Sequence, residues 1–190
     1  MTDKRLKYAD QITLERIKVL HPAIRDKVRE AYLNVNTHML GKCVRLRLAY
    51  TTRSLEEQDA LYAIGRTKLF DASGKRLGKV TNAKGGQSIH NYGLAWDIVL
   101  LLDTNGDGNF DTASWDTVAD FDGDMVADWM EVVDAFKAIG AEWGGDWKFT
   151  DKPHFQMAFG MDWRAMQEKI HNGEFEIEEI DRIKYKWIKL

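Results

Sequence analysis

The sequence predicts a single α+β domain over residues 1–190. Segments with helical spacing of apolar residues alternate along the chain with segments typical of strands, and no internal repeat is present. No stretch has the composition of a linker, and 190 residues are enough for one sizeable hydrophobic core. One compact domain is therefore expected.

The first third of the chain predicts two helices, a strand and a third helix. Residues 9–20 and 22–40 carry apolar side chains at helical spacing. Residues 43–50 alternate between apolar and polar side chains, which is typical of a strand. Ser54 and Glu57 have the spacing of a capping box, so a helix is expected to begin directly after Ser54.

The rest of the chain predicts further helices and strands, and the last two strands complete the expected core. In order they are a polar loop over 71–87, a buried strand over 95–102, a helix over 126–139, strands over 142–149 and 153–159, a short helix over 163–171, and a charged, alternating tail over 174–190. In the long helix, the residues expected to face inward are Val126, Trp129, Val132, Val133, Phe136 and Ile139.

Charge and composition narrow the classes of function. The 30 acidic residues nearly balance the 27 basic ones, so nucleic acid is not an expected partner. The single cysteine, Cys43, excludes an internal disulfide. The N-terminus lacks the apolar core of a secretory signal, and no apolar run approaches the roughly 20 residues that span a membrane. We expect a soluble monomer made in the cytoplasm, without membrane insertion, which meets any external substrate only after release.

Two histidines and an aspartate offer the ligands that suit a catalytic zinc ion. His90 precedes the expected strand that carries Asp97, and Gly93 between them permits a turn. Asp151 lies three residues before His154 and has the chemistry of a general base for a zinc-bound water. Spacing alone also allows a plainer interpretation, in which Asp97 is a buried carboxylate satisfied by backbone N–H groups and His154 is structural.

A serine hydrolase is a rival interpretation of the same region. Ser88, His90 and Asp97 contain the residue types of a catalytic triad. Ser88 lacks the sharp, glycine-flanked turn that exposes a nucleophilic serine, which disfavours the triad.

The pattern Ser88-x-His90-x-x-Gly93-x-Ala95-x-Asp97, followed by Asp151-x-x-His154, resembles the signature of zinc peptidases related to D-alanyl-D-alanine carboxypeptidases. That group includes vancomycin-resistance dipeptidases and L-alanyl-D-glutamate endopeptidases of phages and bacteria. The resemblance covers roughly residues 45–160, within an expected catalytic core of about 43–160. Stretches that are similar to the endopeptidase branch lie at 50–58, 61–67, 80–83 and 142–147.

The resemblance implies a small antiparallel sheet flanked by helices, as in hedgehog and D-Ala-D-Ala peptidase domains, with zinc in a groove. It also implies a role for each matching residue. His90, Asp97 and His154 would hold zinc, Asp151 would be the general base, Arg53 would stabilise the oxyanion, and Ser88 would bind substrate. Tyr92 and Trp147 are expected to line the groove, whereas Trp143 is expected in the core.

An acidic insert over 103–125 contains two imperfect calcium-loop patterns. The first has Asp103, Asn105 and Asp107 at the ligand positions one, three and five but ends on Ser114 at position twelve. In the second, the oxygen donors at positions one, three, five, nine and twelve are Asp120, Asp122, Asp124, Asp128 and Glu131, but Met125 replaces the glycine of position six. The alternative is a solvated acidic turn in front of a helix.

The expected activity is therefore zinc-dependent hydrolysis of bacterial peptidoglycan stem peptides, as in an endolysin or autolysin, with the L-alanyl-D-glutamate bond as the favoured target. D-alanyl-D-alanine carboxypeptidase and dipeptidase activities are alternatives. A hedgehog-like zinc-bearing module that binds the cell wall without cleaving it, and a calcium-binding interaction protein, are non-catalytic alternatives.

Overall fold

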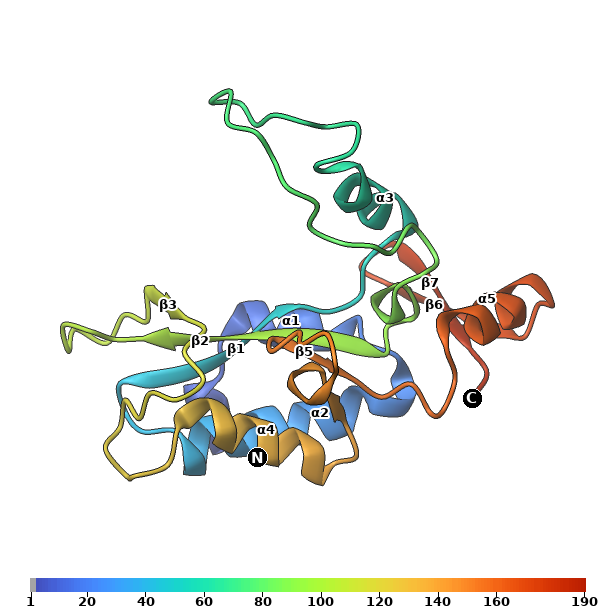
Figure 1. Ribbon diagram of the computed structural model, residues 1–190. Helices are drawn as coiled ribbons and strands as arrows, with labels where there is room; N and C mark the ends of the chain where they lie inside the picture. Colours follow the sequence, from blue (N-terminus) through green and yellow to red (C-terminus); the bar gives the residue numbers. More distant parts are fainter. Residues whose placement is uncertain (1–2) are drawn as a thin grey trace. The chain divides into compact units, whose positions relative to one another are not determined.

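The computed structural model describes residues 3–190, which form two compact units (Figure 1). The first unit runs to Thr51 and resumes over Ala95–Met157. The second unit consists of Thr52–Leu94 and Ala158–Leu190. Each unit is thus assembled from two separate stretches of chain, which is why no change of composition along the sequence marks them.

An antiparallel sheet forms the centre of the first unit. Its strands are β1 (Val44–Tyr50), β2 (Ala95–Leu102), β3 (Thr112–Ser114), β4 (Glu142–Trp143) and β5 (His154–Gln156). The main order is β1-β2-β5-β4, and β3 also pairs with β2. The strand β2 is therefore the hub of the sheet, because it pairs with three others.

Helices of the first unit pack on this sheet. They are a 3-10 turn (Lys4–Tyr8), α1 (Gln11–Lys18), α2 (Pro22–Asn34), a π-helical turn (Val35–Met39), α4 (Asp128–Ala138) and a 3-10 turn (Gly144–Asp146). Figure 1 shows α2 and α4 lying side by side below the strands. Three aromatic rings join α4 to the sheet: Phe136 lies 5.2 Å from Trp96 and 5.1 Å from Phe155, measured between ring centroids. All three side chains are fully buried, so they anchor the core.

The outer edge of β1 is satisfied by side chains from the helical layer. Asn36, in the π-helical turn, accepts a hydrogen bond from the Leu46 amide and donates one to the Leu46 carbonyl. Thr13 of α1 accepts from the Leu48 amide, and Arg16 donates to the Leu48 carbonyl. These contacts occupy the groups that an exposed edge strand would offer to another chain.

The second unit holds the remaining elements. They are α3 (Leu55–Ala63), a 3-10 turn (Ile89–Tyr92), α5 (Trp163–His171), β6 (Phe175–Ile180) and β7 (Ile183–Ile188). The capping box predicted for α3 is present: Ser54 accepts from the Glu57 amide, and the Glu57 carboxylate accepts from the Ser54 amide. The charged tail forms the β6–β7 hairpin, which turns through Asp181 and Arg182 at φ values of 50° and 68°.

The α+β class is confirmed, and most predicted elements are present, although several have different ends; the strand predicted over 153–159, for example, spans only His154–Gln156. The strand predicted over 142–149 stops at Trp143, because the chain enters a 3-10 turn at Gly144. Val126 was expected to face inward but is 46% exposed, since α4 begins only at Asp128. In the part of the chain that the structure describes, no helix has the length and apolar character needed to cross a membrane.

Candidate metal and catalytic site

Asp97 and His154 form a cross-strand pair in the sheet of the first unit. They lie directly opposite each other on β2 and β5, and His154 Nδ1 is 3.2 Å from Asp97 Oδ1. Their neighbours Trp96 and Phe155 point to the other face, into the core, because side chains alternate along a strand. Asp97 also pairs with Tyr50, immediately after the register of β1 shifts. Such irregularities commonly adjust side-chain direction beside active sites.

Gln156 fixes the orientation of the His154 ring. The amide nitrogen of Gln156 donates to Glu142 Oε2 at 2.9 Å, so its oxygen faces His154 Nε2 at 3.2 Å. His154 thus directs its Nε2 proton at Gln156 and its Nδ1 at Asp97, and a metal bound by both side chains would replace the proton between Nδ1 and Asp97. Burial lowers the pKa of His154, but the hydrogen bond and charge of Asp97 outweigh burial, so this pKa lies above its ordinary value. The sequence analysis assigned no role to Gln156.

Asp151 sits at the start of a turn that leads into β5. Its amide donates to the Gly144 carbonyl at 2.9 Å, and its carbonyl accepts from the His154 amide at 3.0 Å. A side chain at position 144 would come within 2.3 Å of the Asp151 carbonyl oxygen. Glycine is therefore required at 144 by close backbone approach. The Asp151 side chain is exposed.

Trp143 and Trp147 lie in this region. The core position expected for Trp143 is observed, and the groove-lining role expected for Trp147 stays a prediction. Trp143 is buried, stacks on Phe155, and donates its indole N–H to the Lys152 carbonyl. It is a core residue, as expected. Trp147 is half-buried, and its ring centroid lies 5.1 Å from that of His154. This places an aromatic surface beside the Asp97–His154 pair.

His90 lies in the second unit, on the 3-10 turn that precedes β2. Gly93 ends the turn with a left-handed φ of 69°, a conformation that glycine adopts without strain. The His90 side chain is only 3% exposed, and its carbonyl accepts from the Arg53 amide at 3.0 Å. Asn91 reinforces this link by donating to the Arg53 and Ser54 carbonyls. The segment that carries His90 is thus joined to the segment that carries Arg53.

Arg53 is held by Gln58, a residue to which the sequence analysis gave no role. Arg53 Nη1 donates to Gln58 Oε1 at 2.9 Å. Gln58 is fully buried, and its amide nitrogen donates to the Ala83 carbonyl at 2.8 Å. From the sequence alone, Arg53 could also be a helix-end cation paired with Glu56 or Glu57; the Glu57 carboxylate accepts from the Ser54 amide and caps α3. Gln58 therefore helps to position the guanidinium group of Arg53.

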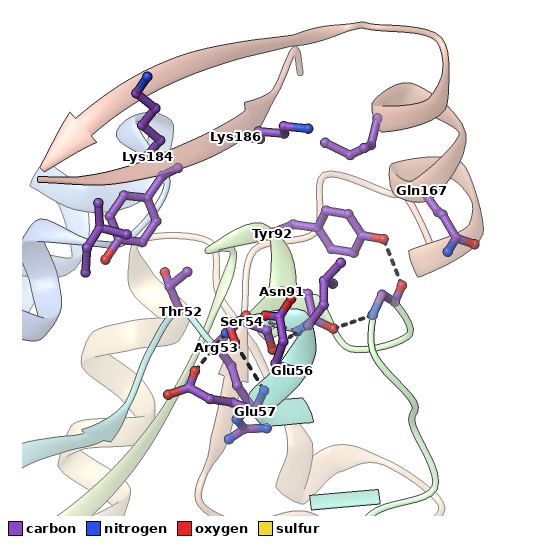
Figure 2. Close-up of a pocket in the computed structure, with 15 residues that line it drawn as sticks. Thr52, Arg53, Ser54, Glu56, Glu57, Asn91, Tyr92, Gln167, Lys184 and Lys186 are labelled. Atoms are coloured by element: carbon purple, nitrogen blue, oxygen red, sulfur yellow. Dashed lines mark hydrogen bonds between the residues drawn. The ribbon is translucent and has the colours of Figure 1, made fainter. Parts of the chain in front are cut away.

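A groove of about 740 Å³ in the second unit includes Arg53 in its wall (Figure 2). Acidic Glu56 and Glu57 come from α3, and basic Lys184 and Lys186 come from β7. Tyr92 also lines it, although the Tyr92 side chain is only 4% exposed and its hydroxyl donates to the Gly86 carbonyl at 2.8 Å. Burial raises the pKa of Tyr92 to about 12. The groove therefore offers groups of both charges to a peptide.

Ser88 occupies a structural position at the start of the His90 turn. Its amide donates to Asn91 Oδ1 at 3.3 Å, and the Gly86 amide donates to the same oxygen. Ser88 is half-buried, whereas a nucleophilic serine would be exposed on a sharp turn. The substrate-binding role suggested for Ser88 remains a prediction.

The ligand set fits zinc by its chemistry. Asp97 and His154 of the first unit and His90 of the second offer two imidazoles and one carboxylate. Two imidazoles and one carboxylate are a known ligand set of catalytic zinc, which keeps a further position for water. Two groups of possible metal ligands within the first unit contain only carboxylates, from the second acidic loop and the first turn of α4. Asp103, Asn105 and Asp107 of the first loop belong to none.

Comparison with known proteins agrees with this chemistry. A family model described as D-alanyl-D-alanine carboxypeptidase matches residues 81–157, which contain all three proposed zinc ligands and Asp151. The chain is 39% identical over 142 residues to the peptidoglycan L-alanyl-D-glutamate endopeptidase CwlK of Bacillus subtilis (strain 168), with 73% of each chain covered. The chain belongs to this peptidase family. These matches confirm the resemblance inferred from the His–Asp motifs. Members of the family are zinc-dependent.

Proposed function

We propose that this peptidase is a zinc-dependent endopeptidase that cleaves the L-alanyl-D-glutamate bond of peptidoglycan stem peptides. The similarity to CwlK over most of both chains carries the choice of substrate and bond. The hydrogen-bonded pair of Asp97 and His154, with Asp151 three residues before His154, supports the choice of chemistry. Its place of action would be the cell wall, and we expect it to act there as a monomer.

His90, Asp97 and His154 would hold the zinc ion, with Gln156 orienting the His154 ring. When bound, zinc polarises a carbonyl oxygen and lowers the pKa of water, so that a nucleophile is available near neutral pH. Asp151 would accept the proton of the attacking water and return it to the leaving amine. Arg53 would stabilise negative charge on the carbonyl oxygen, with Gln58 positioning its guanidinium group.

Two features of the groove in the second unit suit a peptide with free carboxylates. Lys184 and Lys186 alternate along β7 and therefore share one face of the hairpin. Both line the groove together with Arg53. A stem peptide carries carboxylate groups beside the proposed scissile bond, and these three cations would attract them.

Digestion of purified peptidoglycan by the zinc-loaded protein tests the proposal. Mass spectrometry should find fragments with new C-terminal L-alanine and new N-terminal D-glutamate. Release of terminal D-alanine alone would show a carboxypeptidase, and hydrolysis of free D-alanyl-D-alanine to two alanines without cleavage of peptidoglycan would show a dipeptidase. Binding to the wall without any new terminus would show a non-catalytic module of the hedgehog type. Each of these three outcomes would replace the proposed reaction.

A further inference from the structure

Five carboxylates gather in the second acidic loop and in the first turn of α4. Carboxylate oxygens of Asp120, Asp122 and Asp128 all lie within 4.8 Å of one another. The same is true of Asp122, Asp124 and Glu131. Asp122 belongs to both groups, so the five side chains surround a single region of the first unit.

Two of these carboxylates are buried with an oxygen that has no partner. Asp128 is fully buried and Glu131 is 9% exposed. Asp128 Oδ1 and Glu131 Oε2 accept no hydrogen bond, and within residues 3–190 neither side chain forms an ion pair. An isolated buried charge is strongly unfavourable unless a partner or a metal compensates it. A solvated acidic turn therefore does not describe these two residues.

The neighbouring carboxylates increase the need for compensation. Asp120 and Asp122 lie beside Asp128, and Asp122 and Asp124 lie beside Glu131, so like charges gather around both buried groups. A cation bound among these oxygens would remove the repulsion between them.

The backbone also meets the requirement at which the sequence pattern departs from a calcium loop. Met125 occupies position six, where the pattern uses glycine, and it adopts the left-handed conformation with a φ of 77°. Asp120 accepts hydrogen bonds from the Gly123 and Met125 amides, which closes the loop around its first ligand. The loop thus keeps the turn despite a residue for which that conformation is uncommon.

The first acidic loop provides an internal comparison. The Asp103 carboxylate already accepts from the amides of Gly106, Asp107 and Gly108, and the side chains of this loop face solvent. Position twelve is Ser114, on the short strand β3. Among the described residues, the buried oxygens without a hydrogen-bond partner all lie outside this first loop. It is a self-contained turn.

We infer that Asp120, Asp122, Asp124, Asp128 and Glu131 form a calcium site in the second loop. Five carboxylates and a loop carbonyl are the hard oxygen ligands that calcium takes, six to eight at a time and in flexible geometry. Magnesium demands a stricter octahedron and keeps several waters, and zinc prefers nitrogen and sulfur. This site is separate from the proposed zinc ligands and does not depend on the peptidase reaction.

Ion binding in this loop would stabilise the first unit. Asp122 Oδ2 accepts from the Gly41 amide at 2.6 Å, just before β1, and Asp128 Oδ2 accepts from the Phe121 amide at 2.6 Å. The ion would therefore join the loop, the start of α4 and the entry to β1. Because only the folded state presents all five groups together, calcium should raise the melting temperature of the protein.

Calorimetric titration of the zinc-loaded, calcium-free full-length protein with calcium chloride tests the inference. We expect one ion per chain, with a Kd below about 1 mM, the weak end of protein calcium loops. Asp124→Asn, on an exposed residue, and Glu131→Gln should each weaken binding about tenfold or more. In calcium-free buffer Glu131→Gln should melt no lower than the parent, because it removes a buried charge; this excludes misfolding as the reason for lost binding.

Asp107→Asn is the matched control, because it removes a carboxylate from the first loop and should leave calcium affinity unchanged. The inference is overturned if the parent shows neither heat of binding nor a rise in melting temperature up to about 10 mM calcium, far above the usual range. It is also overturned if Asp107→Asn abolishes binding while Asp124→Asn and Glu131→Gln do not. Tighter binding of magnesium than of calcium would contradict the choice of ion.

Discussion

At the scale of single residues, the two ring nitrogens of His154 have different partners, and this difference organises the site. Nε2 faces Gln156, which is itself oriented by Glu142, and Nδ1 faces Asp97. Outer partners of this kind set the tautomer and direction of a metal-binding histidine. Gln156 is therefore expected to be a positioning residue for zinc.

Replacing Gln156 by leucine should weaken zinc affinity by about 10- to 100-fold, the usual cost of losing an outer partner of a ligand. Glu142→Ala is the matched control. It removes the contact between Glu142 and Gln156 but leaves the Gln156 oxygen that faces His154. Competition with a chromophoric chelator measures both affinities. Equal zinc affinity in the parent and Gln156→Leu would show that His154 needs no such support.

The contact between Arg53 and Gln58 predicts non-additive effects on turnover. Arg53→Ala should lower kcat by about two to three powers of ten, as loss of an oxyanion donor does. Gln58→Leu should cost less, because it only loosens the guanidinium group. Since Gln58 acts through Arg53, the double variant should be no slower than Arg53→Ala alone. Multiplicative losses in the double variant would mean that the two residues act independently.

Sequence reasoning identified the residues with distinctive chemistry and missed those that support them. His90, Asp97, Asp151 and His154 stand out by type and by motif. Gln58, Asn91 and Gln156 do not, because an amide side chain serves equally well on any surface. Gln156 lies two residues after His154 on a strand, so a shared face was predictable. Its contact with Glu142 was not, because that depends on the pairing of β4 with β5.

At the scale of elements, the turn that carries Asp151 depends on close approach between two backbone segments. Gly144 contributes a carbonyl to the Asp151 amide and leaves no room for a side chain. The predicted strand over 142–149 was too long for this reason: the chain has to leave the sheet at Gly144 to meet Asp151. Alternation of residue types cannot reveal such a contact.

Gly144→Ala should displace Asp151 and lower turnover by about tenfold or more, because misplacement by 1 Å can cost about 100-fold. Gly78→Ala is the control, since a side chain at 78 would meet no atom within 4 Å. Turnover and melting temperature are measured together. Full turnover in Gly144→Ala would show that the position of this turn does not matter for catalysis.

The start of α1 joins a helix cap to β1 and predicts a pH-dependent stability. Asp10 accepts from the Thr13 amide and pairs with Arg47 through both carboxylate oxygens. Burial raises the pKa of Asp10, but hydrogen bonds from Arg47 and Thr13 outweigh burial, so this pKa is lowered overall. The stabilisation is therefore fully present above the unfolded pKa of about 3.9 and lost as the pH falls through the lower folded pKa.

Asp10→Ala should reduce the free energy of unfolding at pH 7 by about 1–2 kcal/mol, the usual cost of losing such a cap. The difference from the parent should shrink as the pH falls below the unfolded pKa of about 3.9, because the carboxylate of the folded parent is then increasingly protonated. Urea denaturation at several pH values measures it, with Asp26→Asn on the exposed side of α2 as control. A difference that stays constant with pH would rule out the ionised pair as its source.

At the scale of the whole molecule, the chain forms two compact units from four alternating stretches. The α+β class followed from periodicity, but the units did not, because each combines stretches that are distant in sequence. The β6–β7 hairpin likewise appeared in the sequence only as a charged, alternating tail. Family motifs concentrate in the middle of the chain, so they predicted the chemistry better than the architecture.

The proposed reaction depends on Asp151 as the base of a zinc peptidase. The most direct test measures zinc content and peptidoglycan hydrolysis together in Asp151→Asn, beside Asp134→Asn, which alters an exposed carboxylate of α4. Asp151→Asn should keep stoichiometric zinc and the parent melting temperature but lose about two to four powers of ten in turnover, the usual value of general acid–base catalysis. Asp134→Asn should match the parent. Hydrolysis at the parent rate by zinc-loaded Asp151→Asn would contradict the account.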